Sequence, residues 1–210
     1  MLIVQVKRLY YREKLSAAEV GQKLGKTVWQ VIKFMKKNNL PRRSQAETHH
    51  FQFEKQPLSY KKKIKLSFRE TKLHLAGLML YWGEGVKALP WVVDFVNSDK
   101  KMILIFLSML RKVYQVKESK LRILLYCYAN QNPKELIYFW SKLLKIPKKQ
   151  FIKPYIRQDF KPEKINKMPH GVIHIRYCDK KLFSQIMREI DIIANRYSGW
   201  GSEAVKHIAL

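Results

Sequence analysis

The sequence contains few cysteines, few acidic residues and no long apolar run. Its two cysteines, Cys127 and Cys178, do not form a CxxC pair, which favours a reduced intracellular chain without a cysteine zinc site. No uninterrupted apolar run approaches the roughly 18 residues that a transmembrane helix needs. The apolar start of the N-terminus is too short for a signal peptide. We therefore expect a cytoplasmic protein with no membrane partner.

The shortage of acids leaves a large positive charge. Lys and Arg total 42 against 16 Asp and Glu, which gives a net charge of +26 over 210 residues. Such an excess repels itself in the free protein and is usually matched by a polyanion. Nucleic acid is the expected partner, which would place the protein on the nucleoid, and an anionic membrane surface is the alternative. The length allows one medium domain and a small one.

Helix-start and helix-stop signals lie close together near the N-terminus. Ser16 is followed three residues later by Glu19, and Thr27 is followed three residues later by Gln30. Both pairs have the capping-box pattern. Gly25 lies between the two patterns, where a helix would end in a tight turn. With an apolar period over residues 3–12, this predicts three short helices, the last running to about residue 39.

The apolar spacing within these helices resembles a known DNA-binding motif. Val20, Leu24, Val31 and Phe34 fall where a helix-turn-helix buries its residues, and small Gly21 falls where its two helices press together. The segment 16–37 is thus similar to the helix-turn-helix of many bacterial regulators and recombinases.

In such a motif, the N-terminal part of the second helix of the motif, which is the third helix of this chain, enters the major groove. The alternative is that Trp29 packs against a neighbour and that the lysines form a solvated face. Pro41 stops the helix, and the next two arginines would follow the DNA as an arm or form a plain basic linker. The expected DNA-contacting residues of this domain are Thr27, Val28, Trp29, Gln30, Lys33, Lys36, Arg42 and Arg43.

The rest of the chain predicts a linker and a larger mixed domain. Residues 44–66 show no stable apolar period and indicate a basic linker that grades into helix. The expected elements beyond it are a helix ending at residue 84, a hairpin turning near residues 89–90, a helix over about 99–114 capped by Asn97 or Ser98, a strand over 120–128, a helix from Asn132-Pro133, strands within 151–158 and 171–177, and a last helix from Asp179 to about Gly199.

Alternation along the predicted strands separates apolar from basic and aromatic side chains. Arg122, Tyr126 and Tyr128 alternate with apolar residues, while Ile152 and Ile156 are expected on the apolar face. A basic face of this kind can read base edges in the major groove, or it is only a solvated face of a basic protein. The expected DNA contacts from this domain are Lys87, Arg122, Lys153, Tyr155, Arg157, His174 and Arg176.

One acid closes the first apolar helix of this domain. Glu84 lies between Gly83 and Gly85 at the end of a run of Leu, Met, Tyr and Trp. The run includes the letters LAGL at 75–78, and the helix, its terminal acid and the α-β-β-α-β order that follows resemble the LAGLIDADG family of homing endonucleases and their non-cutting relatives. The resemblance covers roughly residues 70–198, with the motif at 77–85. Met79 departs from the small residue that the family usually has at its helix crossing.

The resemblance implies a metal-dependent site shared between two helices. Glu84, with the backbone of Gly83, would hold Mg²⁺ over the scissile phosphates, and Glu84 would be catalytic. Because the chain has one such helix, the second acid would come from another copy, which implies a homodimer on a roughly palindromic target. The alternative is that Glu84 only caps the helix or pairs with a lysine.

The predicted class is α+β: a helix-turn-helix domain over 1–43, a linker over 44–66, a LAGLIDADG-like domain with an antiparallel, DNA-facing sheet over 67–199, and a tail over 200–210. The first functional hypothesis is a site-specific, Mg²⁺-dependent homing-type DNA endonuclease acting as a homodimer, in which Lys153, Arg157 or Arg176 stabilises developing charge. The second is a transcription regulator that keeps the fold without cutting DNA. An RNA-binding, maturase-like protein is the third.

Overall fold

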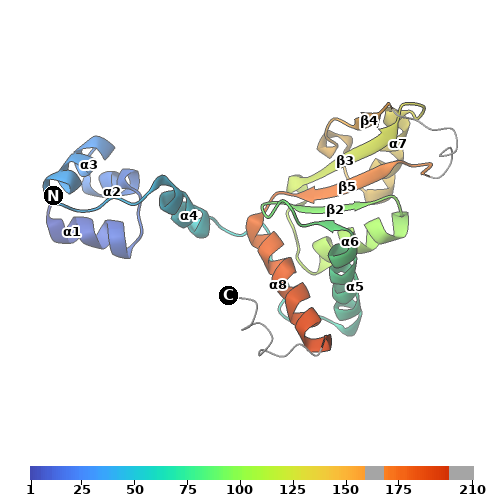
Figure 1. Cartoon of the computed structure of the whole chain (residues 1–210), viewed down its shortest axis with the longest axis horizontal. Helices are drawn as coiled ribbons and strands as arrows, with labels where there is room; N and C mark the ends of the chain where they lie inside the picture. The colour runs from blue at the N-terminus through green and yellow to red at the C-terminus, as the bar shows by residue number, and fades with distance from the viewer. Residues whose placement is uncertain (159–167, 199–210) are drawn as a thin grey trace. The chain divides into compact units, whose positions relative to one another are not determined.

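The computed structural model describes residues 1–158 and 168–198, and the chain separates into two compact units, 1–57 and 58–210 (Figure 1). The first unit is helical and the second combines helices with a sheet, so the chain is α+β. The expected tail over 200–210 and the expected helix end at Gly199 lie outside the described residues.

The first unit has the helix boundaries that its capping signals predict. Its helices are α1 (Ile3–Lys7), which continues as a π-helical turn over Arg8–Arg12, then α2 (Ala17–Leu24), α3 (Val28–Lys37) and α4 (Gln45–Lys55). Ser16 Oγ accepts from the Glu19 amide at 3.2 Å, and the Glu19 carboxylate accepts from the Ser16 amide at 2.7 Å. Gly25 ends α2 in the left-handed region at φ +62°. Both predicted capping boxes are confirmed.

A small apolar core holds α1, α2 and α3 together. Val20 and Val31 are fully buried, while Leu24 and Phe34 pack half-buried at its edge. A side chain at Gly21 would place its Cβ 2.5 Å from the Lys26 carbonyl oxygen, so only glycine fits this close approach. The core positions expected from the sequence are therefore confirmed.

The stretch 44–66 is divided between the two units. Ser44 forms a capping box with Glu47 and starts α4, a helix that buries no residue fully, which explains why no apolar period marks it. Beyond it, the Lys61 amide donates to the Tyr114 carbonyl in the second unit at 2.9 Å. Tyr60 packs on the core of that unit. Part of the expected linker is thus helix and part belongs to the larger unit.

The second unit is built on one five-stranded sheet in the order β1-β2-β5-β3-β4. The helices α5, α6, α7 and α8 pack on one of its faces through a common apolar core (Figure 1). The elements in chain order are α5 (Phe68–Glu84), β1 (Gly85–Val86), β2 (Val93–Asn97), α6 (Lys100–Lys112), β3 (Leu121–Tyr128), α7 (Pro133–Leu144), β4 (Tyr155–Arg157), β5 (Val172–Tyr177) and α8 (Lys180–Tyr197).

The sheet departs from the expected antiparallel arrangement at its edge. β4 runs parallel to β3, because α7 carries the chain over and returns it in the same direction. β4 is also shorter than expected, so Lys153 precedes it, and Ile152 and Ile156 are 37% and 40% exposed rather than buried. The alternating letters of this segment predict a half-buried strand, but β4 is an edge strand that is exposed on both faces. The prediction that 151–158 has a buried apolar face is therefore wrong.

Other local signals gave the right elements, with one cap misplaced. Asn132 caps α7 and Asp179 caps α8, as expected. The cap of α6 is Asp99 rather than Asn97 or Ser98, since Asp99 Oδ1 accepts from the Lys101 amide at 2.6 Å. The Asn97 side chain instead accepts from the Asp99 amide at 2.8 Å.

Candidate nucleic-acid interface

The first turn of α3 presents large side chains to solvent. Trp29 is 66% exposed and Val28 is 43% exposed, because the opposite side of the helix carries the buried Val31. The Lys33 amine lies 4.8 Å from the centre of the Trp29 ring. Lys36 is also exposed. An aromatic ring with a cation beside it is thus held outward on a short, well-capped helix.

Two of the expected contact residues of α3 also hold its N-terminus. Thr27 Oγ1 accepts from the Gln30 amide at 3.2 Å, and Gln30 Oε1 accepts from the Thr27 amide at 2.9 Å. The cap therefore uses the oxygen of the Gln30 side chain, and its NH₂ group is left to donate elsewhere.

Arg43 is placed differently from Arg42. Its guanidinium donates to the Tyr10 carbonyl at 3.0 Å, and to the Leu15 carbonyl, and stacks 4.1 Å from the Tyr10 ring. The same group lies 5.0 Å from the Phe51 ring of α4. Arg43 thus ties the start of α4 to the first helices and is not part of an exposed arm, while Arg42 is exposed.

The sheet face that the helices leave uncovered, called here the open face, carries a continuous row of aromatic and cationic side chains. Tyr155 of β4 lies 4.9 Å from Tyr126 of β3, and Tyr126 lies 4.6 Å from His174 of β5, between ring centres. His174 Nδ1 is 3.0 Å from the Asp94 carboxylate of β2, and Arg176 Nε is 3.0 Å from the same carboxylate. The row therefore crosses four neighbouring strands.

Asp94 is the member of this row that sequence reasoning missed. It is only 4% exposed although it lies on the open face, because the ion-paired side chains of β5 cover it. The one signal for it is an acid interrupting the apolar letters VVDFV. That pattern gives no hint of its two partners, since they lie 80 and 82 residues further along the chain.

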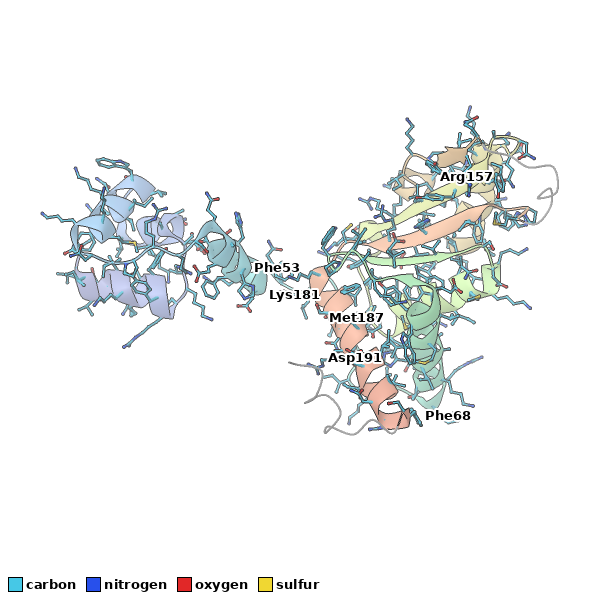
Figure 2. All side chains as sticks on the ribbon, viewed as in Figure 1. Phe53, Phe68, Arg157, Lys181, Met187 and Asp191 are labelled. Atoms are coloured by element: carbon cyan, nitrogen blue, oxygen red, sulfur yellow. The ribbon has the colours of Figure 1, made fainter. Side chains whose placement is uncertain are left out.

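The other basic residues expected to contact DNA lie around this row and are exposed. Arg122 is exposed, but one of its terminal nitrogens donates to the Ser119 and Leu121 carbonyls at 2.7 and 2.8 Å. Lys153 is exposed before β4, and Arg157 is exposed on β4 itself, where Figure 2 labels it. The open face is therefore cationic around a centre that Asp94 holds in place.

Glu84 ends α5 as an exposed carboxylate. It forms no hydrogen bond or ion pair with any described residue. The C-terminal end of a helix carries partial negative charge, so an anion there is disfavoured unless something else uses it. Lys87, three residues further along the chain, donates instead to the Trp82 carbonyl at 2.5 Å. The alternative in which Glu84 pairs with a lysine therefore has no support from the described contacts.

The two glycines beside Glu84 differ in what surrounds them. At Gly85 a Cβ would lie 2.4 Å from the Tyr81 carbonyl oxygen, so the fold itself requires glycine there. At Gly83 a Cβ would meet nothing within 4 Å. Packing within the unit thus explains Gly85 and leaves Gly83 unexplained.

The outer side of α5 is an exposed apolar stripe. Leu75 and Trp82 are 45% and 48% exposed, and Ala76 and Gly83 lie beside them at helical spacing. Met79, in the middle of the stripe, is half-buried and touches the core. The stripe leads along the helix to Glu84.

The opposite side of α5 is anchored by a buried charge cluster. Glu189 of α8 is 8% exposed and accepts from Lys62, from His74 Nε2 at 2.8 Å and from the Tyr114 hydroxyl at 2.9 Å. Burial alone would raise the pKa of Glu189, but the hydrogen bonds from His74, Lys62, Gln185 and Tyr114 lower it to about 2. Burial next to this anion raises the pKa of Tyr114. The cluster is fully paired, which indicates a structural role.

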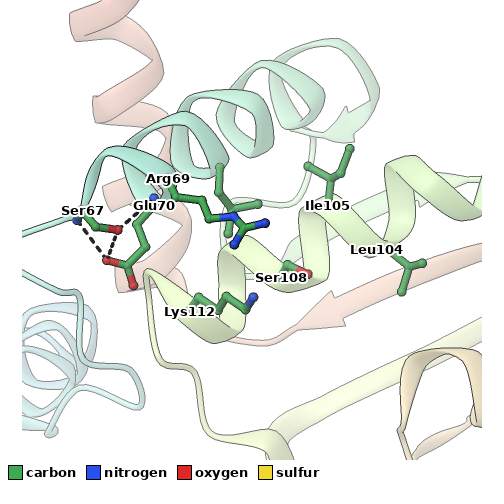
Figure 3. A pocket seen from close by; sticks show the side chains of 8 residues that line it. Ser67, Arg69, Glu70, Leu104, Ile105, Ser108 and Lys112 are labelled. Atoms are coloured by element: carbon green, nitrogen blue, oxygen red, sulfur yellow. Dashed lines mark hydrogen bonds between the residues drawn. The ribbon is translucent and has the colours of Figure 1, made fainter.

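A cleft with a volume of about 600 Å³ lies between the first half of α5 and α6 (Figure 3). Ser67 and Glu70 line it from α5, and Ser108 and Lys112 line it from α6. A hydrogen bond from Lys63 lowers the pKa of Glu70 to about 2. The cleft is at the far end of α5 from Glu84 and belongs to neither the open face nor the helix end.

Within residues 1–158 and 168–198, no three His, Cys, Asp or Glu side chains form a group that could hold a metal ion. None of the helices in these ranges is both long and apolar enough to cross a membrane. Comparison with protein-family models, with curated proteins and with solved structures finds no match for this chain. Its function must therefore be argued from its own residues.

Proposed function

We propose that this protein binds double-stranded DNA at a specific sequence, through α3 of the first unit and through the open face of the second. The observation that carries the proposal is the exposed side of α3, where Trp29 of the first turn and Lys33 of the second project from a helix whose other side is buried. A helix that follows a glycine turn and begins at a capped residue is what enters the major groove in helix-turn-helix proteins.

The open face supports the same proposal independently. A twisted sheet with cationic and aromatic side chains on one side can follow a groove and read base edges. The net charge of +26 supplies the phosphate attraction that any such protein needs. Double-stranded DNA is favoured over RNA, because α3 is a helix of the size that enters the DNA major groove, while the major groove of A-form RNA is too narrow for side chains to read.

The test is binding of the full chain and of Trp29→Ala to a duplex selected from a random library. Because Trp29 is 66% exposed, its loss leaves the core of the unit intact. We expect Trp29→Ala to bind the selected duplex about tenfold more weakly, as for the loss of one base contact. Equal binding by both proteins, or equal binding of duplex and single-stranded RNA, would contradict the proposal.

The exposed stripe on α5 supports a homodimer. A run of apolar side chains left in water is costly in solution, and a second copy of the same helix would cover it. Ala76 and Gly83 would allow close approach of the two helices, which also gives Gly83 a reason that packing within the unit does not provide. The two Glu84 carboxylates would then lie near the twofold axis.

DNA cleavage is the second candidate, favoured by the carboxylate of Glu84, which has no partner in the described part of the chain. Mg²⁺ prefers carboxylate, carbonyl, water and phosphate oxygens, and Glu84 with the Gly83 carbonyl offers two of these. Bound there, the ion would neutralise the scissile phosphate and activate water. Since no described group of ligands is complete in one chain, two copies and the DNA would have to share the site. Lys153, Arg157 or Arg176 would stabilise negative charge on the phosphate.

The cleavage test uses a plasmid that carries the gene with its genomic surroundings, with Mg²⁺, and compares the wild type with Glu84→Gln. Asp191→Asn is the matched control, since Asp191 is an exposed acid on α8 (Figure 2). We expect cutting by wild type and control and none by Glu84→Gln. Specific binding without cutting by any of the three would establish the non-cutting regulator instead. Equal cutting by Glu84→Gln would remove Glu84 from the site.

A further inference from the structure

Asp94 is the only acid in the five described strands of the sheet, and it lies on the face that we assign to DNA. A carboxylate on such a face repels phosphates, and burying it to 4% exposure costs free energy unless it is paired. Both effects oppose its presence. Its contacts must therefore do something that a simple cationic surface would not need.

The first contact fixes the orientation of a histidine. Because the Asp94 carboxylate accepts at Nδ1 of His174, that nitrogen carries the proton, and the other ring nitrogen is the one available to a ligand. His174 Nε2 has no hydrogen-bond partner among the described residues. The Tyr126 ring, packed 4.6 Å from the imidazole, restricts its rotation.

The second contact is an ion pair that places an arginine. Asp94 Oδ2 lies 3.0 Å from Nε of Arg176, at the side of the guanidinium. Neither terminal nitrogen of Arg176 donates to a described residue. These two nitrogens form a rigid planar fork that matches the O6 and N7 acceptors of guanine. Nε itself is buried and donates no hydrogen bond to a described residue, so the Asp94 carboxylate holds the guanidinium by charge attraction. A guanidinium held in this way loses less rotational freedom when the fork binds.

We propose that Asp94 is a positioning residue that makes the open face selective, by holding the Arg176 fork and the His174 imidazole toward the edge of a guanine in the DNA major groove. The inference rests on the proposed DNA binding and deepens it. A purely structural ion pair would explain why Asp94 is buried, but nothing more. The terminal nitrogens of Arg176 and Nε2 of His174 have no partner among the described residues, and a binding role explains this in addition.

The first experiment measures the ratio of affinities of the full chain for its selected duplex and for a scrambled duplex of the same composition. Asp94→Asn keeps the shape and removes one negative charge, and Asp191→Asn removes the same charge from an exposed position on α8. We expect Asp94→Asn to lower the ratio about tenfold while its affinity for scrambled DNA stays equal or rises. We expect Asp191→Asn to keep the wild-type ratio. A ratio for Asp94→Asn equal to that of Asp191→Asn overturns the proposal.

The second experiment separates a guanine from a phosphate and does not need Asp94→Asn to fold. Each guanine of the selected duplex is replaced in turn by 7-deazaguanine, which lacks the N7 acceptor. The wild type should lose about tenfold in affinity at one position, and Arg176→Lys, which keeps the charge without the fork, should lose nothing further there. If no guanine matters, and Arg176→Lys weakens all duplexes equally, then Arg176 contacts phosphate and the proposal fails.

The two failures are distinguishable. A wild-type chain that selects no duplex sequence contradicts the proposed function itself. A wild-type chain that selects a sequence, with Asp94→Asn behaving as its control, contradicts only the positioning role.

Discussion

At the scale of single residues, the acids of this basic chain show which positions have a purpose. Glu189 is buried and receives hydrogen bonds from a lysine, a histidine and a tyrosine. Asp94 is buried between a histidine and an arginine. Glu84 alone of these three is exposed and unpaired among the described residues. The first stabilises the fold, and the other two are the acids to which the proposed DNA binding and cleavage assign a role.

The lowered pKa of Glu189 predicts how stability responds to acid. A carboxylate with a lowered folded-state pKa contributes stability that is present above its unfolded pKa and is lost as pH falls toward the folded value of about 2. We expect Glu189→Gln to destabilise the second unit at neutral pH by roughly 2–4 kcal/mol. We also expect it to flatten the loss of stability between about pH 5 and pH 2.

Scanning calorimetry of the full chain is the measurement, with the transition of each unit followed separately. Glu118→Gln is the control, because Glu118 is an exposed acid paired with Arg111 at 2.7 Å, and a surface pair contributes less than a buried cluster. The lowered pKa of Glu70 leaves some acid dependence in every variant. If the stability of Glu189→Gln falls with pH in parallel with that of the wild type, the buried cluster is not the source of the acid dependence.

At the scale of elements, α5 has two faces with different tasks. One packs on α6, where Gly77 meets Met109, and the other is the exposed stripe that ends near Gly83. A Cβ at Gly77 would lie 2.8 Å from the Met109 Cβ, whereas one at Gly83 meets nothing. The two glycines of one helix therefore give a matched pair of substitutions.

We expect Gly77→Ala to destabilise the second unit by about 1–3 kcal/mol through overpacking. Gly83→Ala should leave stability unchanged or raise it by up to about 1 kcal/mol, because alanine favours helix. If Gly83 lies at a helix crossing between copies, the same change should weaken the dimer. Calorimetry and sedimentation measure the two effects. A Gly83→Ala protein that dimerises as tightly as the wild type would exclude the crossing.

The sequence predicted those elements whose signals are local. The Ser16–Glu19 and Thr27–Gln30 boxes and the Asn132 cap lie within a few residues of the helices that they start, so short-range chemistry defines them. The pairing of β4 parallel to β3 depends on how α7 crosses the sheet, which no local pattern encodes. The contacts of Asp94 and Arg43 could not be predicted for the same reason, because only the fold brings their partners together.

At the scale of the whole molecule, the proposed function separates two contributions to DNA binding. One is the attraction of the net charge, and the other is recognition of the DNA sequence. The net charge of +26 attracts any DNA, and it alone would give binding without selectivity. In the proposed function, selectivity comes from α3 and from the row of side chains on the open face. The endonuclease and the regulator differ only in what Glu84 does after that binding.

This division predicts a steep dependence of affinity on salt. For every phosphate that the protein neutralises, the logarithm of the binding constant falls by about 0.9 per decade of salt concentration. We expect a similar steep slope for selected and scrambled duplexes, with the selected duplex tighter at every concentration. Fluorescence anisotropy over a salt series measures both lines. A flat response would contradict nucleic acid as the partner of the charge.

The most direct measurement for the proposed function as a whole is selection of duplexes from a random double-stranded library by the full wild-type chain. Sequence-specific binding by a twofold dimer predicts that successive rounds enrich one site whose two halves are related by approximate inverted symmetry. Bound duplexes that remain random after every round would contradict sequence-specific DNA binding.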